Sequence, residues 1–450
     1  ARKEIPSGLL ARCVVMDRRE AVTANQVDEG QAGEFSIERL GAQGDGVATD
    51  LHGSGPVFIP YTLPGERVRA LMVGDGGGGV RARLIEVLEP SADRIAPKCS
   101  HFMQCGGCTL QHVADENYAA WKRSLIVEAF AQRGIAADVA PLVMTGAGSR
   151  RRAVMSALAT SGGIVLGFHG ARDEKVLPVN ECPVLDAQIT AALGGIRGVL
   201  AAIPRWEGEA RVSILAADNG LDVAVADAVG KGGLDAACSA RVAGEAARVS
   251  SIVRLSFDGT PVYLRASPML TMGGVQVSPP GGSFLQASAV AERAMAQFVV
   301  AAAPKKAKTA VDLFSGVGAF TFPLAARFAV LAVDSDRSAL AALTAAARNA
   351  KGLKPIHRDL FREPLSRKEL EPYDMAVFDP PRAGAKAQAE MLAKSKVPVV
   401  VAVSCNPATL ARDARILIDG GYALGTVTPI DQFTWSSHVE AVAVLRRSSR

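Results

Sequence analysis

One cysteine near the C-terminus stands where an apolar run stops. Residues 397–403 are mostly branched and apolar, the run ends at Ser404-Cys405-Asn406-Pro407, and a helical pattern begins directly behind it. Open α/β sheets bind their ligands at the carboxyl ends of their strands, and a cysteine placed there can act as a nucleophile. The alternative is a small hydrophobic side chain of the core. Cys405 is therefore a candidate nucleophile that other motifs must support.

A second chemical motif is the strand-turn-helix pattern in residues 309–325. The segment "TAVDLFSGVGAFTFPLA" predicts a strand, a turn with two glycines and a helix that begins near Phe320. Asp334 ends the next predicted strand, where a carboxylate can bind both hydroxyls of a ribose. Thr321 stands where a dinucleotide fingerprint has its third glycine, and the chain has no phosphate loop. The pattern thus favours S-adenosylmethionine over dinucleotides and nucleoside triphosphates.

A third strand ends at Asp379 in "YDMAVFDPPRAG". The two prolines that follow fix the backbone and would hold this carboxylate in place, although the motif alone also fits a plain strand terminator. The glycine turn, this motif and the cysteine motif all belong to one predicted sheet. We therefore expect four candidate groups along its carboxyl edge: Phe314, Asp334, Asp379 and Cys405.

The elements that position these groups form four predicted regions in a chain of 450 residues. Alternating short strands predict a small β-barrel, and apolar strands alternating with Ala-rich helices predict a doubly wound, Rossmann-like α/β domain. Between them we expect an α+β domain with a helix over residues 115–134 and a hairpin turning at Asn219-Gly220. The expected regions are a flexible arm (1–30), the barrel (31–92), the central domain (93–272) and the α/β domain (273–450).

Composition and charge narrow the function classes. Hydrophobic residues make up 49% of the chain and charged residues 21%, as in soluble globular proteins. No apolar run has the length of a membrane span, and the first twenty residues lack a signal-peptide core, so we expect a cytoplasmic protein without a membrane partner. The net charge of +5 permits a nucleic-acid partner.

The seven cysteines are spaced too irregularly for a disulfide framework and suit metal or catalytic roles better. Cys99, Cys105 and Cys108 form a C-x5-C-x2-C motif, and Cys182 can add a fourth thiolate. Four thiolates suit tetrahedral zinc or an iron–sulfur cluster, and the spacing leaves both open. Cys13 and Cys238 are expected to be ordinary free thiols.

The motifs "DLFSGVGAF", "FDPPRAG", "SCNPATLARD" and "SSHVEAVAVL" together resemble the RNA uracil-5-methyltransferases, which make 5-methyluridine. The resemblance covers nearly the whole chain. It implies that Cys405 is the nucleophile, that Glu440 accepts a proton, and that S-adenosylmethionine is the methyl donor. The residues that match the family's cofactor contacts are Gln286, Phe314, Asp334, Asp359 and Asp379. Two positions depart from the family pattern, because Ala319 and Ser288 stand where it usually has asparagine.

The resemblance also supplies expectations for the other regions. One branch of the family has this cysteine pattern and binds a [4Fe-4S] cluster, and the barrel resembles the RNA-binding TRAM domain, which is OB-fold-like. Candidate RNA contacts on the barrel are Arg39, Phe58, Tyr61, Arg67, Arg69, Arg81 and Arg83. Arg382 is a further candidate for binding a phosphate or a carboxylate.

The implied reaction makes further demands. It needs a thiolate, so we expect the site to lower the pKa of Cys405 or to deprotonate it on binding. The target uridine must be unpaired or flipped out of its helix. The combined features favour 23S rRNA as substrate, with tRNA as the alternative and a small molecule as a weaker one, and we expect a monomer.

Overall fold

The computed structural model describes residues 32–49, 55–75, 79–171, 173–230, 233–350 and 352–448. The expected arm (1–30), with Cys13, lies outside the described residues. The chain divides into two compact units. The first comprises residues up to Ala96 together with Thr109–Ala114, and the second comprises Pro97–Cys108 together with Asp115–Arg450.

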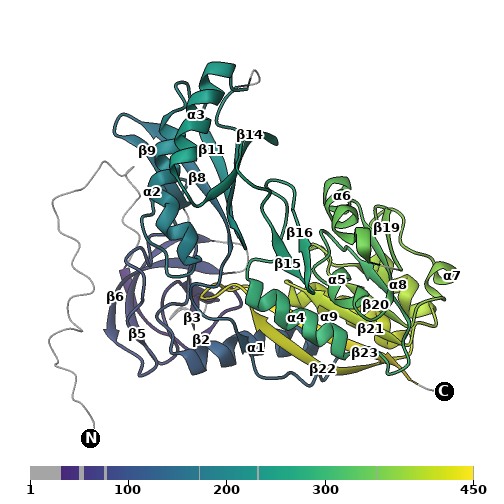
Figure 1. The fold of residues 1–450 in the computed structure, drawn as a ribbon. Helices are drawn as coiled ribbons and strands as arrows, with labels where there is room; N and C mark the ends of the chain where they lie inside the picture. The colour runs from purple at the N-terminus through teal and green to yellow at the C-terminus, as the bar shows by residue number, and fades with distance from the viewer. Residues whose placement is uncertain are drawn as a thin grey trace, which may run out of the picture. The chain divides into compact units, whose positions relative to one another are not determined.

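The first unit, which contains the purple strands in Figure 1, is a six-stranded sheet in the order β1-β5-β6-β4-β3-β2. Alternate residues such as Val57 and Ile59 are fully buried in its core. Arg94, beyond the expected boundary at 92, donates to the buried Glu66 at 2.5 Å and so ties the following segment to this sheet. The strands are β1 (Ala32–Ser36), β2 (Arg39–Leu40), β3 (Gly46–Thr49), β4 (Pro56–Ile59), β5 (Arg67–Asp75) and β6 (Val80–Glu89).

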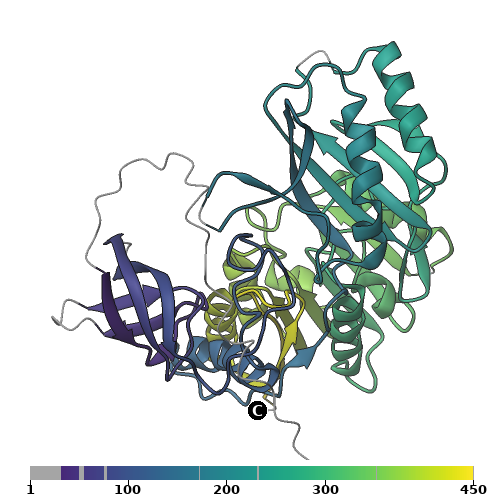
Figure 2. The ribbon, with the colours of Figure 1, turned by 90° about the vertical axis from the view of Figure 1, so that its left-hand side faces the viewer.

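The second unit contains a seven-stranded sheet in the order β10-β9-β8-β11-β12-β13-β14. Helices α2 (Ala187–Ala201) and α3 (Ala236–Arg248) pack on it (Figure 2), and Cys238 is buried in that core. The expected hairpin is confirmed, because Ala217 pairs with Gly220 across the turn. The strands are β8 (Arg152–Thr160), β9 (Gly163–His169), β10 (Val176–Pro178), β11 (Glu209–Ala217), β12 (Gly220–Ala226), β13 (Ile252–Phe257) and β14 (Thr260–Leu264).

An eight-stranded sheet in the order β19-β18-β17-β20-β21-β23-β22-β7 forms the C-terminal part. The first five strands are parallel, as expected for a doubly wound sheet. The chain then returns along β21 in the opposite direction, so the sheet is mixed rather than parallel throughout. Its strands are β7 (Val143–Met144), β17 (Thr309–Leu313), β18 (Ala329–Asp334), β19 (Leu353–His357), β20 (Met375–Phe378), β21 (Val399–Ser404), β22 (Tyr422–Asp431) and β23 (Glu440–Arg447). A two-stranded sheet, β15 (Leu270–Met272) and β16 (Val275–Val277), lies before β17 in sequence.

Helices cover both faces of this sheet, and β21 shows how. All six of its residues are buried: Val400 and Ala402 belong to one hydrophobic cluster, and Val401 belongs to the cluster on the opposite face. Burial on both faces explains the nearly continuous apolar sequence of this strand. The covering helices are α1 (Asp115–Ala131), α8 (Lys386–Lys394) and α9 (Pro407–Asp419) on one side, and α4 (Ala289–Ala301), α5 (Thr321–Ala325) and α6 (Arg337–Ala346) on the other. The short α7 (Arg367–Leu370) lies before β20 in sequence.

Helix α1 comes from the sequence region assigned above to the central domain, yet it packs on the C-terminal sheet. Ile126 and Phe130 are fully buried in the same cluster as Val311 and Leu417. The neighbouring strand β7 pairs with β22. Residues 115–144 thus complete the body that carries the strand-end motifs. Within the described residues, no helix is long and apolar enough to cross a membrane.

Candidate active site

The glycine turn after β17 has the backbone that its sequence requires. Phe314, Gly316 and Gly318 all have positive φ angles, of 63°, 53° and 107°. A Cβ atom at Gly318 would lie 2.5 Å from the ring of Phe322, so only glycine fits there without a shift. The Gly316 N–H donates to Asp334 Oδ2 at 2.8 Å. The first and second strand ends are thereby joined.

Two buried polar atoms beside this turn have no hydrogen-bond partner among the described residues: Asp312 Oδ1 and Ser315 Oγ. The other Asp312 oxygen accepts from Thr321 Oγ1 at 2.5 Å, and burial raises the pKa of Asp312 to about 7. Buried polar atoms are rarely left unpaired unless a water or ligand completes them. The end of β17 thus has the unfilled polar positions of a ligand site.

The third parallel strand, β19, brings Asp359 and Phe361 to the same edge. The Arg358 N–H donates to the backbone oxygen of Asp334 at 2.8 Å, and Asp359 Oδ1 accepts from the Phe361 N–H at 3.0 Å. The ring centroids of Phe314 and Phe361 are 5.4 Å apart. Asp334, Asp359 and Phe314, all selected from the sequence, therefore lie around one edge of the sheet.

A chain of hydrogen bonds connects the remaining acidic groups. Gln286 Nε2 donates to Asp379 Oδ2 at 2.7 Å, and Gln286 Oε1 accepts from Gln432 Nε2 at 2.8 Å. Gln432 Nε2 also donates to Glu440 Oε1 at 3.0 Å. The structure therefore links three residues selected from the sequence, and it adds Gln432, which the sequence analysis missed. The available signal was a polar pair, Asp431-Gln432, directly after the apolar Pro429-Ile430 at the end of β22.

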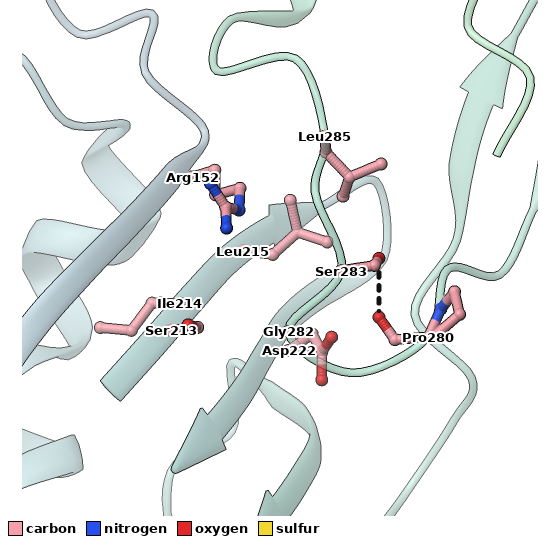
Figure 3. A pocket seen from close by; sticks show the side chains of 9 residues that line it. All are labelled: Arg152, Ser213, Ile214, Leu215, Asp222, Pro280, Gly282, Ser283 and Leu285. Carbon is pink, nitrogen blue, oxygen red and sulfur yellow. Dashed lines mark hydrogen bonds between the residues drawn. The ribbon is translucent and has the colours of Figure 1, made fainter. Parts of the chain in front are cut away.

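Gln286 is positioned by a loop that packs on the central sheet. Figure 3 shows a small pocket in which Leu215 of β11 and Leu285 of the loop approach each other. The loop is held further because Arg254, which forms a buried ion pair with Asp222, donates to the backbone oxygen of Pro279 at 2.8 Å. The loop that carries Gln286 is therefore held from the central sheet.

Cys405 and Glu440 are neighbours because β21 and β23 are antiparallel. Ser404 pairs with Ala441, so the residue after β21 and the first residue of β23 meet at one end of the sheet. Burial, then the charges of Glu440 and Asp379, raise the pKa of Cys405 to about 11, whereas Arg382 acts in the opposite direction. The alternative that the free protein lowers this pKa is therefore wrong.

Glu440 is almost completely buried, and its Oε2 atom has no partner among the described residues. Burial, followed by the charge of Asp379, raises the pKa of Glu440 well above its usual value. Burial also raises the pKa of Asp379, to about 7. Two such acids disfavour simultaneous ionisation in the free protein.

The motif around Cys405 is tied to the proline turn that follows Asp379. Asn406 caps α9 by accepting from the Ala408 N–H at 3.1 Å. Its Nδ2 donates to the backbone oxygen of Arg382 at 3.0 Å. The Arg382 side chain reaches His438 Nε2 at 2.7 Å, and burial lowers the pKa of His438 to about 4, so a neutral ring accepts this bond. The structure gives Arg382 an imidazole partner rather than a carboxylate.

Helix α1 anchors the β22–β23 loop (residues 432–439), which precedes Glu440. Lys122 and Asp431 form an ion pair with both side chains fully buried, and Tyr118 donates to Asp431 Oδ2 at 2.9 Å. Lys122 also donates to the backbone oxygens of Phe433 at 3.0 Å and His438 at 2.6 Å. Both ends of the loop are therefore bound to one ammonium group. Sequence alone did not select Lys122, because a lysine within a helix usually faces solvent.

The four cysteines predicted as metal ligands lie in the second unit, and each is partly buried. Cys105 Sγ accepts from the Gly107 N–H at 3.4 Å, and Cys182 accepts from the N–H groups of Val184 and Leu185. Burial raises the pKa of Cys105 and of Cys182, and Cys99 contributes to both shifts as a like charge. Within the described residues, no three His, Cys, Asp or Glu side chains already form a metal-ion site.

The candidate RNA contacts of the first unit are partly engaged within it. Arg67 pairs with Glu34 and Glu89, each at 2.6 Å, and Arg69 pairs with Glu86 at 2.7 Å. All five of these side chains are at least 40% exposed, so the pairs are open to exchange with phosphate.

Comparison with known proteins identifies the family. A family model described as tRNA (uracil-5-)-methyltransferase matches residues 357–448. A protein named uncharacterized RNA methyltransferase from Mesorhizobium japonicum is 46% identical over 92% of this chain and 98% of its own length. The 23S rRNA (uracil(1939)-C(5))-methyltransferase of Chromohalobacter salexigens is 31% identical, over 96% of this chain and 93% of its own. The chain belongs to the RNA uracil-5-methyltransferase family.

A solved structure supports the fold of this RNA methyltransferase. The Pyrococcus abyssi tRNA (uracil-54, C5)-methyltransferase, in complex with S-adenosyl-L-homocysteine, has a TM-score of 0.71 and 22% identity. The match covers 92% of this chain and all of that one. The methyltransferase also accommodates its departure at Ser288, whose Oγ accepts from the Ala291 N–H at 3.3 Å and caps α4.

Replacing Lys122 with methionine tests the anchor of the β22–β23 loop. Lys122→Met leaves Asp431 buried without its cationic partner, and we expect the free energy of unfolding to fall by about 3–5 kcal/mol. Urea unfolding followed by tryptophan fluorescence measures the change. Arg133→Met, at an exposed position just beyond α1, is the matched control and should stay within about 0.5 kcal/mol of wild type. Equal stability of the two variants would contradict the anchor.

Proposed function

We propose that this methyltransferase transfers a methyl group from S-adenosylmethionine to carbon 5 of a uridine in 23S rRNA, through a covalent bond from Cys405 to carbon 6. The observation that carries the proposal is the pairing of β21 with β23, which sets a nucleophile beside a buried acid. The glycine turn and Asp334 lie at the same edge of the sheet. This arrangement suits transfer to a base activated by covalent addition.

The residues at the edge of the sheet fit the methyl donor. Asp334 stands where a carboxylate can accept the ribose hydroxyls, and Phe314 and Phe361 offer aromatic faces for an adenine ring. The unpaired oxygens of Asp312 and Ser315 offer partners for the polar amino-acid part. When bound, the donor supplies an electrophilic methyl group on a positively charged sulfur.

The reaction begins with ionisation of Cys405, whose thiol is neutral near pH 7 in the free protein. Cys405, Asp379 and Glu440 all ionise more readily beside a sulfonium charge, releasing their protons to solvent. The Cys405 thiolate then adds to carbon 6. The S–C6 bond forms, the electrons of the C5–C6 double bond form a C4–C5 double bond, and those of the C4 carbonyl move to its oxygen. Carbon 5 of this enolate then attacks the methyl group, the bond from methyl to sulfur breaks, and neutral S-adenosylhomocysteine is left.

Glu440 completes the reaction by removing the hydrogen from carbon 5. The C5–H electrons restore the double bond, the S–C6 bond breaks, and Cys405 leaves as a thiolate. The positive charge disappears from the site when the methyl group is transferred, so the pKa of Glu440 rises again at the moment when it must accept a proton. Gln286 and Gln432 hold Asp379 and Glu440 in fixed positions relative to each other during both steps.

The substrate class follows from the relatives and from the first unit. The Chromohalobacter salexigens relative is named for 23S rRNA, whereas the Pyrococcus abyssi protein is named for tRNA and is less similar in sequence. A TRAM-type, OB-fold-like role for the six-stranded sheet, with its exposed arginines, supports RNA over a small-molecule substrate. Methylated tRNA is the alternative outcome.

We further propose that Cys99, Cys105, Cys108 and Cys182 hold a [4Fe-4S] cluster. Such clusters are bound by four thiolates, and backbone N–H groups directed at their sulfurs stabilise the thiolate charge. The N–H groups at Cys105 and Cys182 have this arrangement. Each thiolate of a cluster binds a different iron atom, so the sulfurs need not converge on one ion.

Two substitutions test the covalent mechanism. Cys405→Ala should abolish methyl transfer and all covalent complex formation. Glu440→Gln keeps the oxygen that Gln432 binds but cannot accept the proton, so turnover should fall roughly 10²–10⁴-fold. Addition and methyl transfer remain open to this variant, which should accumulate as an adduct with methylated RNA.

A denaturing gel measures the adduct as a shifted protein band. RNA containing 5-fluorouridine should trap wild-type protein in the same way, because fluorine cannot leave as a cation. Normal turnover by Cys405→Ala would refute the nucleophile. A Glu440→Gln variant that turns over normally and traps nothing would move the base elsewhere, with Asp379 next in line.

The ribose contact is tested at Asp334. Asp334→Ala should weaken S-adenosylmethionine binding by about 1.5–3 kcal/mol for each charge-assisted bond lost. The affinity of Asp334→Asn, which retains one acceptor oxygen, should lie between those of the wild-type protein and Asp334→Ala. Asp336→Ala removes the cap of α6 two residues away and serves as the control. Unchanged affinity of Asp334→Ala in calorimetry would show that this acid does not bind the ribose.

The cluster is tested by metal analysis of protein purified without oxygen. We expect about four iron atoms per chain and broad absorption near roughly 400 nm. Cys108→Ser should lose the iron, whereas Cys238→Ser, at the buried thiol in α3, should retain it. Stoichiometric zinc without iron would contradict the cluster.

A further inference from the structure

The β22–β23 loop is contacted by residues that adjoin the four cysteines in sequence or in space. Lys98, the residue before Cys99, places its Nζ atom 5.5 Å from the ring centroid of Trp435. The backbone N–H of Trp435 donates to the Tyr118 hydroxyl at 2.8 Å, and Trp435 has a positive φ of 59°. A non-glycine residue keeps such a backbone angle only where its surroundings enforce it. The contact from Lys98, beside Cys99, is therefore one of the interactions that hold Trp435 in this conformation.

Arg150 makes the most direct connection between the cysteines and this loop. Its backbone lies beside the segment that follows Cys182: the Arg150 N–H donates to Val184 O at 3.2 Å, and its oxygen accepts from the Asp186 N–H at 2.9 Å. Its side chain lies near Cys108 and Cys182, whose charges counteract the lowering of its pKa by burial. The guanidinium is also 5.9 Å from the centroid of the Phe433 ring. One arginine thus binds the segment that follows Cys182 through its backbone and contacts the loop through its side chain.

From Phe433 the contacts continue to both catalytic groups. The Phe433 ring packs edge-on against His438 at 5.8 Å, and His438 accepts from Arg382, whose backbone oxygen is held by Asn406. Phe433 also follows Gln432, the amide that binds Glu440. A displacement of Phe433 therefore reaches Cys405 on one side and Glu440 on the other.

We propose that occupancy of the four-cysteine site sets the conformation of the β22–β23 loop, and that Arg150 is the positioning residue that carries this effect to the catalytic pair. The proposal rests on the iron–sulfur site proposed above. A tetrathiolate cluster is anionic and rigid, and it would fix the guanidinium by charge. Without the cluster the four cysteines are no longer held as one rigid unit. The segment after Cys182 that binds the Arg150 backbone is then less constrained, and so is the contact of Arg150 with Phe433.

The test compares Arg150→Met with Arg150→Lys, and uses Arg211→Met as the control. Arg211 is an exposed residue of β11 whose nearest carboxylate, Asp227, is 3.6 Å away. Iron content is measured first, and hydrogen exchange is then measured in residues 432–439, where the N–H groups of Trp435 and Ser436 are hydrogen-bonded. We expect Arg150→Met to retain iron and yet to exchange about ten-fold faster in this loop, as for the loss of one charge-assisted contact.

Kinetics and cluster removal complete the test. In Arg150→Met, kcat and the rate of adduct formation with 5-fluorouridine RNA should fall while KM for S-adenosylmethionine stays unchanged. Arg150→Lys should recover part of kcat and part of the rate of adduct formation, because it restores the charge without the planar group. Cys108→Ser protein, without iron, should show the same fast exchange in residues 432–439.

The outcomes separate this inference from the proposal on which it rests. Iron present together with wild-type exchange in the Arg150→Met loop would overturn the inference alone. Normal loop protection in iron-free Cys108→Ser protein would do the same. Absence of iron from the wild-type protein would overturn the cluster and this inference together, without affecting the assignments of Cys405 and Glu440.

Discussion

The antiparallel return of β23 along β21 is the constraint on which the active site depends. Parallel strands can bring only residues that end or directly follow a strand to the carboxyl edge of a sheet, as Asp334 and Asp379 do. Reversing the last strand brings a residue that begins a strand to the same edge, and Glu440 is that residue. The pairing of Ser404 with Ala441 then sets the acid beside Cys405 through backbone hydrogen bonds, without a flexible loop between them.

Burying two carboxyl groups beside a thiol is costly, and the surroundings of this site limit that cost. Gln432 bridges Gln286 and Glu440, so each acid keeps one hydrogen bond while its charge remains disfavoured. The loop that carries Gln432 is in turn bound by the buried Lys122. The resulting site is rigid, and a cation that enters it would lower the free-energy cost of ionising these groups. The raised pKa values of these groups and the attraction of the site for a cation therefore have a common origin.

The sequence allowed four of the parallel strands (β17, β18, β20 and β21), the glycine turn and the positions of Cys405, Asp334 and Asp379 to be predicted, because strand periodicity and turn chemistry are local properties. Glu440 came from a family motif, since an acid near a chain end has no local signature of burial. Gln432 and Lys122 were missed for a related reason. Lys122 acts through Phe433 and His438, 311 and 316 residues away, and Gln432 acts through Gln286, 146 residues away, and no local pattern encodes such contacts. The same long-range pairing placed α1 on the C-terminal sheet.

The position of α1 also affects how the protein can be divided and how it is made. Lys122 forms the ion pair with Asp431, and β7 pairs with β22. The sheet that carries the active site is therefore completed by residues 115–144, which leave the ribosome long before its other strands do. Residues 273–450 expressed alone would bury an unpaired carboxylate and expose the face that Ile126 and Phe130 cover. The methyltransferase body is therefore not a module that can be cut at the start of its α/β pattern. A minimal fragment, a domain fusion or a transplanted version of it has to include residues 115–144.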